Sequence, residues 1–386
     1  MIDVPPLPPF QPHPPDAAGV LSWAHLGDLH MTLAGEQNHL DLLLLIQLLN
    51  TAFAPGLSFT FLPGDVADTG SAAQYTVVRQ ALDTLDLPWC AIVGDHDVHE
   101  KSFSHFLQFM APATHVRFRI GDVCFFALNA FDVPDPGSFA ILSAQLEWLE
   151  AGLRAMSSRQ SAVLFLHCYP TDLKVGGGEL TDLLSRFPVR LVEMGHTHYN
   201  ELSNDGHTLF AATRSTGQIE EGTVGFSVTN LDGPVVSWRF LPLHSLPAVI
   251  ITSPADERLI TAQHLSTQVA ANPVRVRAKT WSTAPMRHVS ATLAGNTFSL
   301  RRVADSDVWQ GELTGTTLPD GVYTLLVTAV DDIGRQGTDS IRIVLGTSAY
   351  LAPERHPRDQ DNALPAWPEH GLLGTQLGPN KHGRKW

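Results

Sequence analysis

Short apolar runs alternate with helical patterns over residues 19–243. The runs are four to six residues long, as is typical of buried strands, and lie at residues 21–26, 59–62, 89–93, 123–128, 162–166 and 190–193. Apolar positions with the longer helical period lie at residues 37–53, 71–85, 102–110, 143–156 and 179–186. This alternation predicts a layered α/β domain whose ligands gather at the carboxyl ends of the strands.

The helical patterns stop after residue 198. Four apolar runs follow, at residues 201–202, 208–211, 225–228 and 235–240. We expect them to be successive antiparallel strands of a second sheet that packs on the first. The α/β domain is therefore predicted to span residues 19–246.

A different pattern begins near residue 247. Strand-like runs lie at residues 274–278, 289–293, 309–313, 322–330 and 340–345, with turn sequences such as Pro319-Asp320-Gly321 between them. Clustered ligand candidates do not occur in this part of the sequence. Residues 247–346 are thus predicted to form an all-β domain that resembles the immunoglobulin-like sandwiches appended to bacterial enzymes.

The two ends of the chain have other compositions. Residues 1–18 form a proline-rich extension without the basic start or apolar core of a secretory signal. Residues 347–386 lack a periodic core face but contain large apolar side chains, namely Tyr350, Leu351, Trp367, Leu372, Leu373 and Trp386. We interpret this stretch as an extended C-terminal arm that lies over the protein or over a neighbouring subunit, which would allow a homo-oligomer through the arm or the all-β domain. The alternative is a disordered tail.

Composition narrows the possible partners and location. The chain has 386 residues, which suggests two domains, and a net charge of −14, which argues against binding to nucleic acid or anionic membranes. Its three cysteines are widely spaced and follow neither a disulfide nor a zinc pattern, so we expect buried free thiols. The most apolar run, residues 42–49, is far shorter than the roughly 20 residues of a membrane span. A cytoplasmic location is the resulting expectation.

Polar segments that could bind metal follow five of the predicted strands. They are Asp28-Leu29-His30, Gly64-Asp65-Val66-Ala67-Asp68, Gly94-Asp95-His96-Asp97, His167 and Gly195-His196-Thr197-His198. A glycine directly precedes the first candidate ligand of each multi-residue segment, and we expect it to let the chain turn sharply. Three carboxylates and four imidazoles, with His96 to spare, suit two metal ions that accept mixed oxygen and nitrogen ligands.

The ordered set resembles the calcineurin-like metallophosphoesterase superfamily, whose pattern is DxH, GDxxD, GNH(D/E), H and GHxH. The resemblance covers residues 19–243 and implies a two-sheet β-sandwich flanked by helices, with two metal ions (Mn²⁺, Fe²⁺/Fe³⁺ or Zn²⁺). It further implies that Asp65 bridges both ions. The other ligands would be Asp28, His30 and His198 for the first ion, and Asp95, His167 and His196 for the second.

Within this superfamily the nearer likeness is to small bacterial phosphodiesterases. The resemblance implies that hydroxide held between the ions attacks phosphorus, that His96 protonates the leaving group, and that Asp68 orients His96. Arg214 is a candidate phosphate clamp, or alternatively a surface or strand-edge arginine. The alternatives to a phosphodiesterase of small substrates are a phosphomonoesterase, a nuclease, or a catalytically silent metal-binding scaffold.

One position departs from the family pattern. Asp95 stands where the family usually has asparagine, so the site loses an amide donor and gains a carboxylate. The added negative charge should repel a phosphomonoester dianion more than a diester monoanion. We therefore expect a bias toward phosphodiesters.

Overall fold

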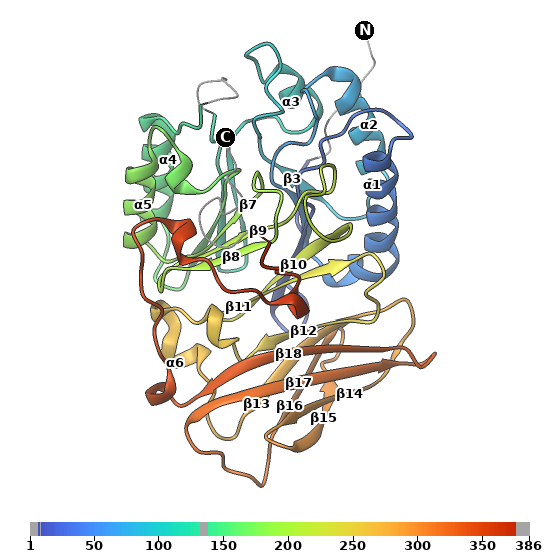
Figure 1. Cartoon of the computed structure of the whole chain (residues 1–386), viewed down its shortest axis with the longest axis vertical. Coiled ribbons are helices and arrows are strands. Elements are labelled where there is room, and N and C mark those ends of the chain that lie inside the picture. The colour runs from blue at the N-terminus through green and yellow to red at the C-terminus, as the bar shows by residue number, and fades with distance from the viewer. Residues whose placement is uncertain (1–6, 8, 132–137, 376–386) are drawn as a thin grey trace.

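Two regions of different architecture make up the chain (Figure 1). The computed structural model describes residues 7, 9–131 and 138–375, so Trp386, residues 1–6 and 8 of the N-terminal extension, and residues 132–137 lie outside the described part. The upper region in Figure 1 contains the sheets and helices of the α/β domain, and the lower region consists mainly of strands. The predicted fold class, an α/β two-sheet domain joined to an all-β domain, is confirmed.

The α/β domain contains two sheets. The first has the order β11-β10-β1-β2-β3, in which β1, β2 and β3 are parallel neighbours. Its strands are β1 (Val20–His25), β2 (Phe59–Leu62), β3 (Trp89–Ala91), β10 (Gly225–Asp232) and β11 (Val235–Pro242). The second has the order β4-β5-β6-β7-β9-β8. Its strands are β4 (Val116–Ile120), β5 (Val123–Ala127), β6 (Ser161–Phe165), β7 (Val189–Met194), β8 (Glu201–Asn204) and β9 (Leu209–Ala212).

Aromatic side chains fill the space between the two sheets. Trp23 and Phe59 of the first sheet stack at 5.7 Å, and Phe61 stacks on Phe165 of the second sheet at 3.8 Å between ring centroids. Alternate residues point outward, so Ala24 and Leu62 contact the helix-side core instead. Because both faces of these strands are buried, their sequences are almost entirely apolar.

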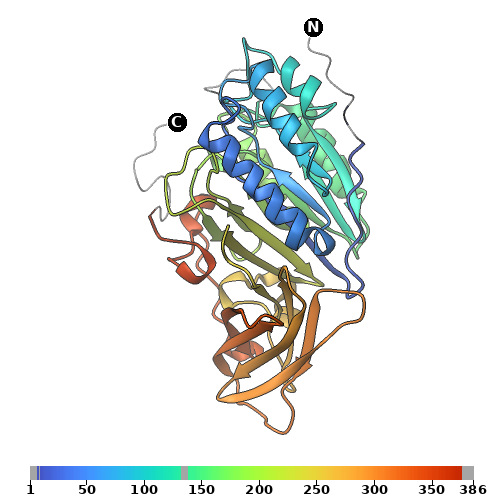
Figure 2. The ribbon, with the colours of Figure 1, turned by 90° about the vertical axis from the view of Figure 1, so that its right-hand side faces the viewer.

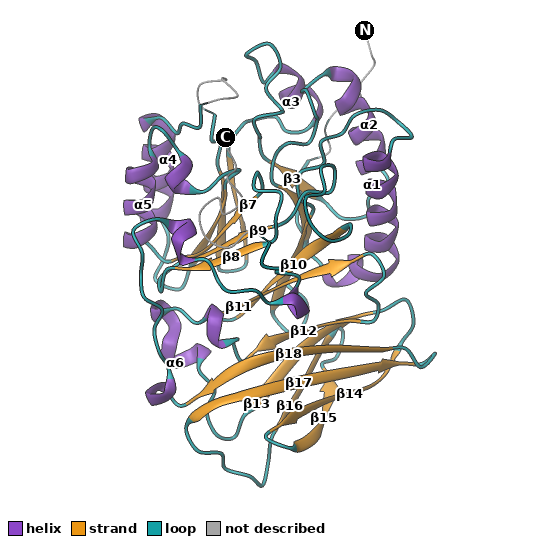
Figure 3. Ribbon diagram, in the orientation of Figure 1, coloured by secondary structure: helices purple, strands orange, loops and turns teal. Residues whose placement is uncertain are grey.

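Helices cover the outer faces of both sheets (Figure 3). Helices α1, α2 and α3 lie on the side of β3, and α4 and α5 lie on the opposite side of the domain. Their bounds are α1 (Gln37–Leu48), α2 (Ala72–Leu82), α3 (Ser104–Phe109), α4 (Ser143–Arg154) and α5 (Gly177–Arg186). None of the helices in the described part of the chain combines the length and apolar character that crossing a bilayer requires.

The strands that follow residue 198 do not form a sheet of their own, so this expectation was wrong. Strands β8 and β9 extend the second sheet beside β7, whereas β10 and β11 extend the first sheet beside β1. Strand β9 pairs parallel to β7, and β10 pairs antiparallel to β1. Local patterns indicate strands but do not show which sheet each one joins.

The all-β domain is a seven-stranded assembly in the order β12-β13-β16-β15-β14-β17-β18. Its strands are β12 (Ala248–Ser253), β13 (Arg275–Trp281), β14 (Met286–Leu293), β15 (Asn296–Arg302), β16 (Val308–Glu312), β17 (Gly321–Asp331) and β18 (Gln336–Leu345); a short helix, α6 (Leu265–Gln268), precedes β13. Five of these strands were expected, and β12 and β15 were missed. The immunoglobulin-like affiliation of this domain stays a prediction.

The C-terminal arm, residues 347–386, returns to the α/β domain over its described part. In Figure 1 it runs in red from the all-β domain across the front of the α/β domain, and Figure 2 shows the same arrangement from the side. Trp367 and Leu372 of the arm are buried. The three cysteines form no disulfide; Cys90 and Cys168 are buried and Cys124 is half-buried.

Candidate metal centre

The five polar segments lie just beyond the carboxyl ends of five strands from both sheets. Residues 28–30 follow β1, residues 64–68 follow β2, and residues 94–97 come after β3 in the first sheet. Residues 167 and 195–198 follow β6 and β7 in the second sheet. Parallel strands point the same way, so their carboxyl ends bring these loops together at one edge of the domain.

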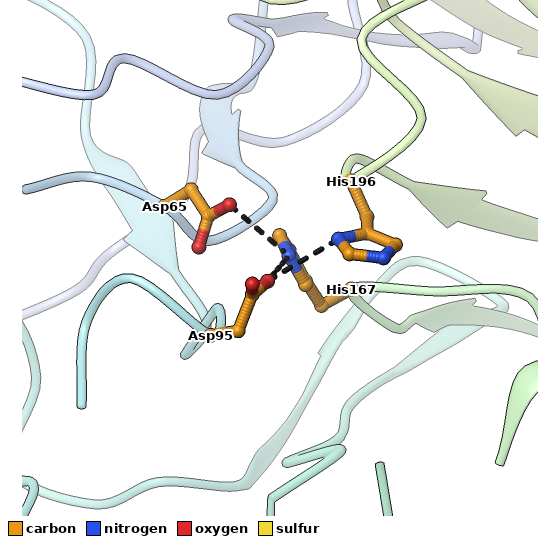
Figure 4. Close-up of side chains that lie close together, drawn as sticks. All are labelled: Asp65, Asp95, His167 and His196. Carbon is orange, nitrogen blue, oxygen red and sulfur yellow. Dashed lines mark hydrogen bonds and ion pairs between the residues drawn. The ribbon is translucent and has the colours of Figure 1, made fainter. Parts of the chain in front are cut away.

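Four of the predicted ligands form one compact group (Figure 4). Asp65, Asp95, His167 and His196 each offer one ligand atom, and these atoms lie within 4.8 Å of one another. Asp95 Oδ1 is 3.1 Å from His167 Nε2 and 3.2 Å from His196 Nδ1. Two carboxylates and two imidazoles are a donor set that Mn²⁺, Fe and Zn²⁺ accept.

A second group shares a member with the first. His30, Asp65 and His198 also place ligand atoms within 4.8 Å of one another, with 3.0 Å between the Nε2 atoms of His30 and His198. Asp65 Oδ2 lies 3.6 Å from His30 Nε2 and 3.5 Å from His167 Nε2. One carboxylate therefore faces both groups, which is the arrangement that a bridging ligand requires.

Asp28 is the predicted ligand that the structure does not bring into either group. Its carboxylate accepts the backbone N–H of His196 at 3.1 and 3.2 Å and lies 3.9 Å from His167 Nδ1. Burial raises the pKa of Asp28 to about 7. In this structure Asp28 fixes the loop that carries His196.

Four of the candidate ligands have left-handed backbone conformations. The φ angles are +40° for His30, +50° for Asp65, +62° for His196 and +59° for His198. A non-glycine residue in this region costs of order 1–3 kcal/mol, and such residues cluster at functional sites. The backbone strain therefore coincides with the ligand positions.

The glycines before the ligands serve two purposes. Only Gly64 has a positive φ, +105°, and so fits the expected sharp turn. At Gly94 a Cβ would lie 2.2 Å from Asp65 Oδ1, and at Gly195 it would lie 2.4 Å from Asp28 Oδ1. Close approach of two ligand loops, rather than chain reversal, thus requires glycine at these two positions.

The charges within the groups favour metal-ready protonation states at Asp65, His30 and His196, but not at His167. Burial and Asp95 oppose ionisation of Asp65, but the neighbouring His167 and His30 outweigh them and lower its pKa to about 2. Burial lowers the pKa of His30 and that of His196, so both imidazoles are neutral near pH 7. Ionised carboxylates and neutral imidazoles are the forms that bind metal. Although burial opposes it, Asp65 and Asp95 raise the pKa of His167 well above its ordinary value, so a bound metal ion would have to displace a proton from this imidazole.

His96 lies next to the two ligand groups that share Asp65 but is not a member of either group. It is grouped with His30 and Asp68, and its side chain is 38% exposed. His96 Nδ1 donates a hydrogen bond of 2.7 Å to the backbone carbonyl of Asp68, whereas the Asp68 carboxylate is 3.9 Å away. The hydrogen bond between His96 and Asp68 thus involves the Asp68 main chain, and the orienting role of Asp68 stays a prediction.

Arg214 is not brought to the candidate ligands. Its guanidinium lies 3.8 Å above the Phe240 ring and donates to the carbonyl of Thr223 at 2.5 Å. It lines a cavity between β11, residues 244–249 and the arm, which none of the candidate ligands lines. Arg214 is buried and follows the end of β9 at Ala212, so it is neither a surface nor a strand arginine. Its role as a phosphate clamp stays a prediction.

Asp97 is a structural residue of the site to which the sequence had assigned no role. Its buried carboxylate accepts the backbone N–H groups of Val66, Ala67 and Gly94, and also the Tyr75 hydroxyl at 2.7 Å. Asp97 thereby ties the loop of Asp65 to the loop of Asp95. An aspartate two residues after a ligand was the available signal, but its contacts depend on the tertiary fold.

Comparison with known proteins agrees with this picture. Residues 21–200 match the family model described as calcineurin-like phosphoesterase. Over 149 residues the chain is 26% identical to a probable glycerophosphodiester phosphodiesterase, GpdQ, of Arcobacter nitrofigilis. That alignment covers 35% of this chain and 54% of the relative, so the chain spans about half the relative's length.

Solved structures also match this chain, among them two phosphatases. A dimetal phosphatase of Danio rerio aligns with 58% of this chain and 96% of its own, at 14% identity and a TM-score of 0.49. The purple acid phosphatase PPD1 of yellow lupin aligns with 59% of this chain and 52% of its own, at 12% identity and a TM-score of 0.48.

Proposed function

We propose, from the match of residues 21–200 to the calcineurin-like phosphoesterase model, that this chain is a member of that family and hydrolyses small phosphodiesters at a centre of two metal ions. The observation that carries the proposal is the position of Asp65, whose carboxylate takes part in both ligand groups. His30 and His198 would complete one metal site, and Asp95, His167 and His196 the other. Bound ions would supply Lewis acidity and an activated water.

The residues of the chain supply positioning and proton transfer. His96 Nδ1 carries a hydrogen toward the Asp68 carbonyl, so its Nε2 is the atom available to exchange a proton with substrate. The neighbouring Asp65, Asp68 and Asp95 raise the pKa of His96 although burial opposes this, which favours the protonated form that a general acid needs. We assign His96 to protonation of the leaving oxygen.

The preference for diesters rests on charge and on the relative's name. Asp95 adds a carboxylate beside Asp65, and a phosphomonoester dianion meets more repulsion there than a diester monoanion does. The similar protein from Arcobacter nitrofigilis is named a probable glycerophosphodiester phosphodiesterase. Both observations favour a small phosphodiester as the substrate of this chain.

One paired experiment tests the proposal. Purified protein is analysed for bound metals and assayed with an aryl phosphodiester and the corresponding monoester. We expect about two equivalents of metal and faster turnover of the diester. Metal binding without turnover of either ester would support a silent scaffold, and faster monoester turnover would support a phosphomonoesterase.

A further inference from the structure

The C-terminal arm contains a buried polar side chain whose partners lie next to the metal centre. Gln360 is 4% exposed although it lies in an arm whose only local structure here is the short 3₁₀ turn η7 (Asp359–Asn362). A buried amide is stable only when its polar atoms have hydrogen-bond partners. The identity of those partners shows what this part of the arm holds in place.

Two hydrogen-bond partners of Gln360 lie in the short turn η3 (Pro170–Asp172), which begins three residues after His167. Gln360 Nε2 donates to Asp172 Oδ1 at 3.0 Å, and the Thr171 hydroxyl donates to Gln360 Oε1. The arm thus binds the segment that leads directly away from a candidate metal ligand. Movement of η3 would be transmitted to the His167 backbone.

The arm also contacts the loop that carries His198. Asn200, two residues after His198, donates from Nδ2 to the carbonyl of Gly371 at 3.0 Å. Leu364 N–H donates to the carbonyl of Leu202 at 2.7 Å, on the strand that follows. The arm is therefore attached after both histidine-bearing loops of the second sheet.

We propose that the C-terminal arm is a positioning element of the metal centre, and that Gln360 acts through its hydrogen bonds to η3 to hold His167 in its metal-binding geometry. The inference rests on the proposed function for its relevance to catalysis. Its direct consequence, however, is metal affinity, which can be measured without any substrate.

The test uses full-length protein with Gln360→Met, which preserves the side-chain volume but removes both hydrogen bonds. Leu351→Ala is the matched control, since Leu351 lies in the same arm and is 90% exposed. Metal-free protein is titrated with Mn²⁺, and the free energy of unfolding is measured in parallel. We expect about tenfold weaker binding at one of two sites in Gln360→Met, in the range seen for outer-shell residues, and no change in the control.

The outcomes separate the two hypotheses. Weaker Mn²⁺ binding, with turnover restored by excess Mn²⁺, supports the positioning role of Gln360. Unchanged Mn²⁺ affinity overturns it, even if Gln360→Met unfolds more easily, because the contact would then be merely structural. A wild-type protein that binds Mn²⁺ but cleaves no phosphoester removes the proposed function, while the affinity comparison still decides the role of the arm.

Discussion

The Nε2 atoms of His30 and His198 face each other at 3.0 Å, with the Asp65 carboxylate beside them. Two neutral imidazoles directed at one point can both donate lone pairs to a cation there. His198 belongs to this group alone, whereas Asp65 belongs to both groups. We predict that His198→Ala retains about one of two metal ions and that Asp65→Ala retains neither. Elemental analysis of the purified variants measures this difference, and equal metal loss in both would contradict a shared carboxylate.

Asp95 should influence the choice between ester types. We predict that Asp95→Asn raises the ratio of monoester to diester kcat/KM about fivefold, because one charge at about 4 Å from a phosphate contributes about 1 kcal/mol in a water-exposed site. Elemental analysis should show that both metals remain bound. An unchanged ratio in a fully metallated variant would remove the basis for the assigned role of Asp95.

Replacing His96 should reduce the catalytic rate more than replacing Asp68. We predict that His96→Ala lowers kcat at least about 100-fold for an alkyl phosphodiester, with a smaller loss for an aryl diester whose leaving group needs no protonation. Asp68→Ala should lose much less activity, because the backbone carbonyl that orients His96 remains. Steady-state kinetics on both substrates checks this order. Equal losses in the two variants would instead assign the orienting role to the Asp68 carboxylate.

The sequence predicts the α/β part well because its strands are buried on both faces. Runs such as residues 59–62 and 162–166 are almost wholly apolar and lie within one residue of the observed strands. Strand β15 (Asn296–Arg302) was missed because Leu300 is its one fully buried apolar side chain. Strand β12 (Ala248–Ser253) lies between two prolines and was interpreted as a domain boundary.

From the sequence, the candidate site could be predicted only as an ordered series of motifs, without the distances between their side chains. The order of motifs after strands identifies His30, Asp65 and His167, but distances depend on how two sheets meet. The hydrogen bond of Asp28 to the His196 backbone, and the contact of Gln360 with η3, join segments more than 160 residues apart. Local sequence patterns contain no information on such pairs.

Asp97 should be a stability determinant of the site. Replacing it with alanine leaves three buried backbone N–H groups without their acceptor, so we predict that Asp97→Ala lowers the free energy of unfolding by about 3 kcal/mol. Tyr75→Phe removes one donor to the same carboxylate and should cost about 1 kcal/mol. Urea unfolding of metal-free protein measures both. A loss in Asp97→Ala no greater than that in Tyr75→Phe would show that the loops do not depend on this carboxylate.

Lowering the pH should weaken the contact between the C-terminal arm and Asp339 of β18. His370 of the arm lies 2.7 Å from the Asp339 carboxylate, and Arg239 of β11 lies 3.5 Å from it. Burial alone would raise the pKa of Asp339, but His370 and Arg239 outweigh it and hold the pKa below its ordinary value. A depressed carboxyl pKa means that its stabilisation is present above the unfolded pKa of about 3.9 and is lost as the pH falls toward the folded pKa.

We therefore predict that the free energy of unfolding of the wild type falls as the pH drops below about 4, and that Asp339→Asn is less stable at pH 7 and shows a weaker dependence on pH in this acid range. Asp332→Asn, at an exposed position of the same domain, is the matched control. Urea unfolding across this pH range gives the comparison. Suppose that Asp339→Asn and the control both showed the same pH dependence of the unfolding free energy as the wild type. The ionised Asp339 carboxylate would then not be what holds His370 against the all-β domain, because removing its charge would not have changed the loss of stability in acid.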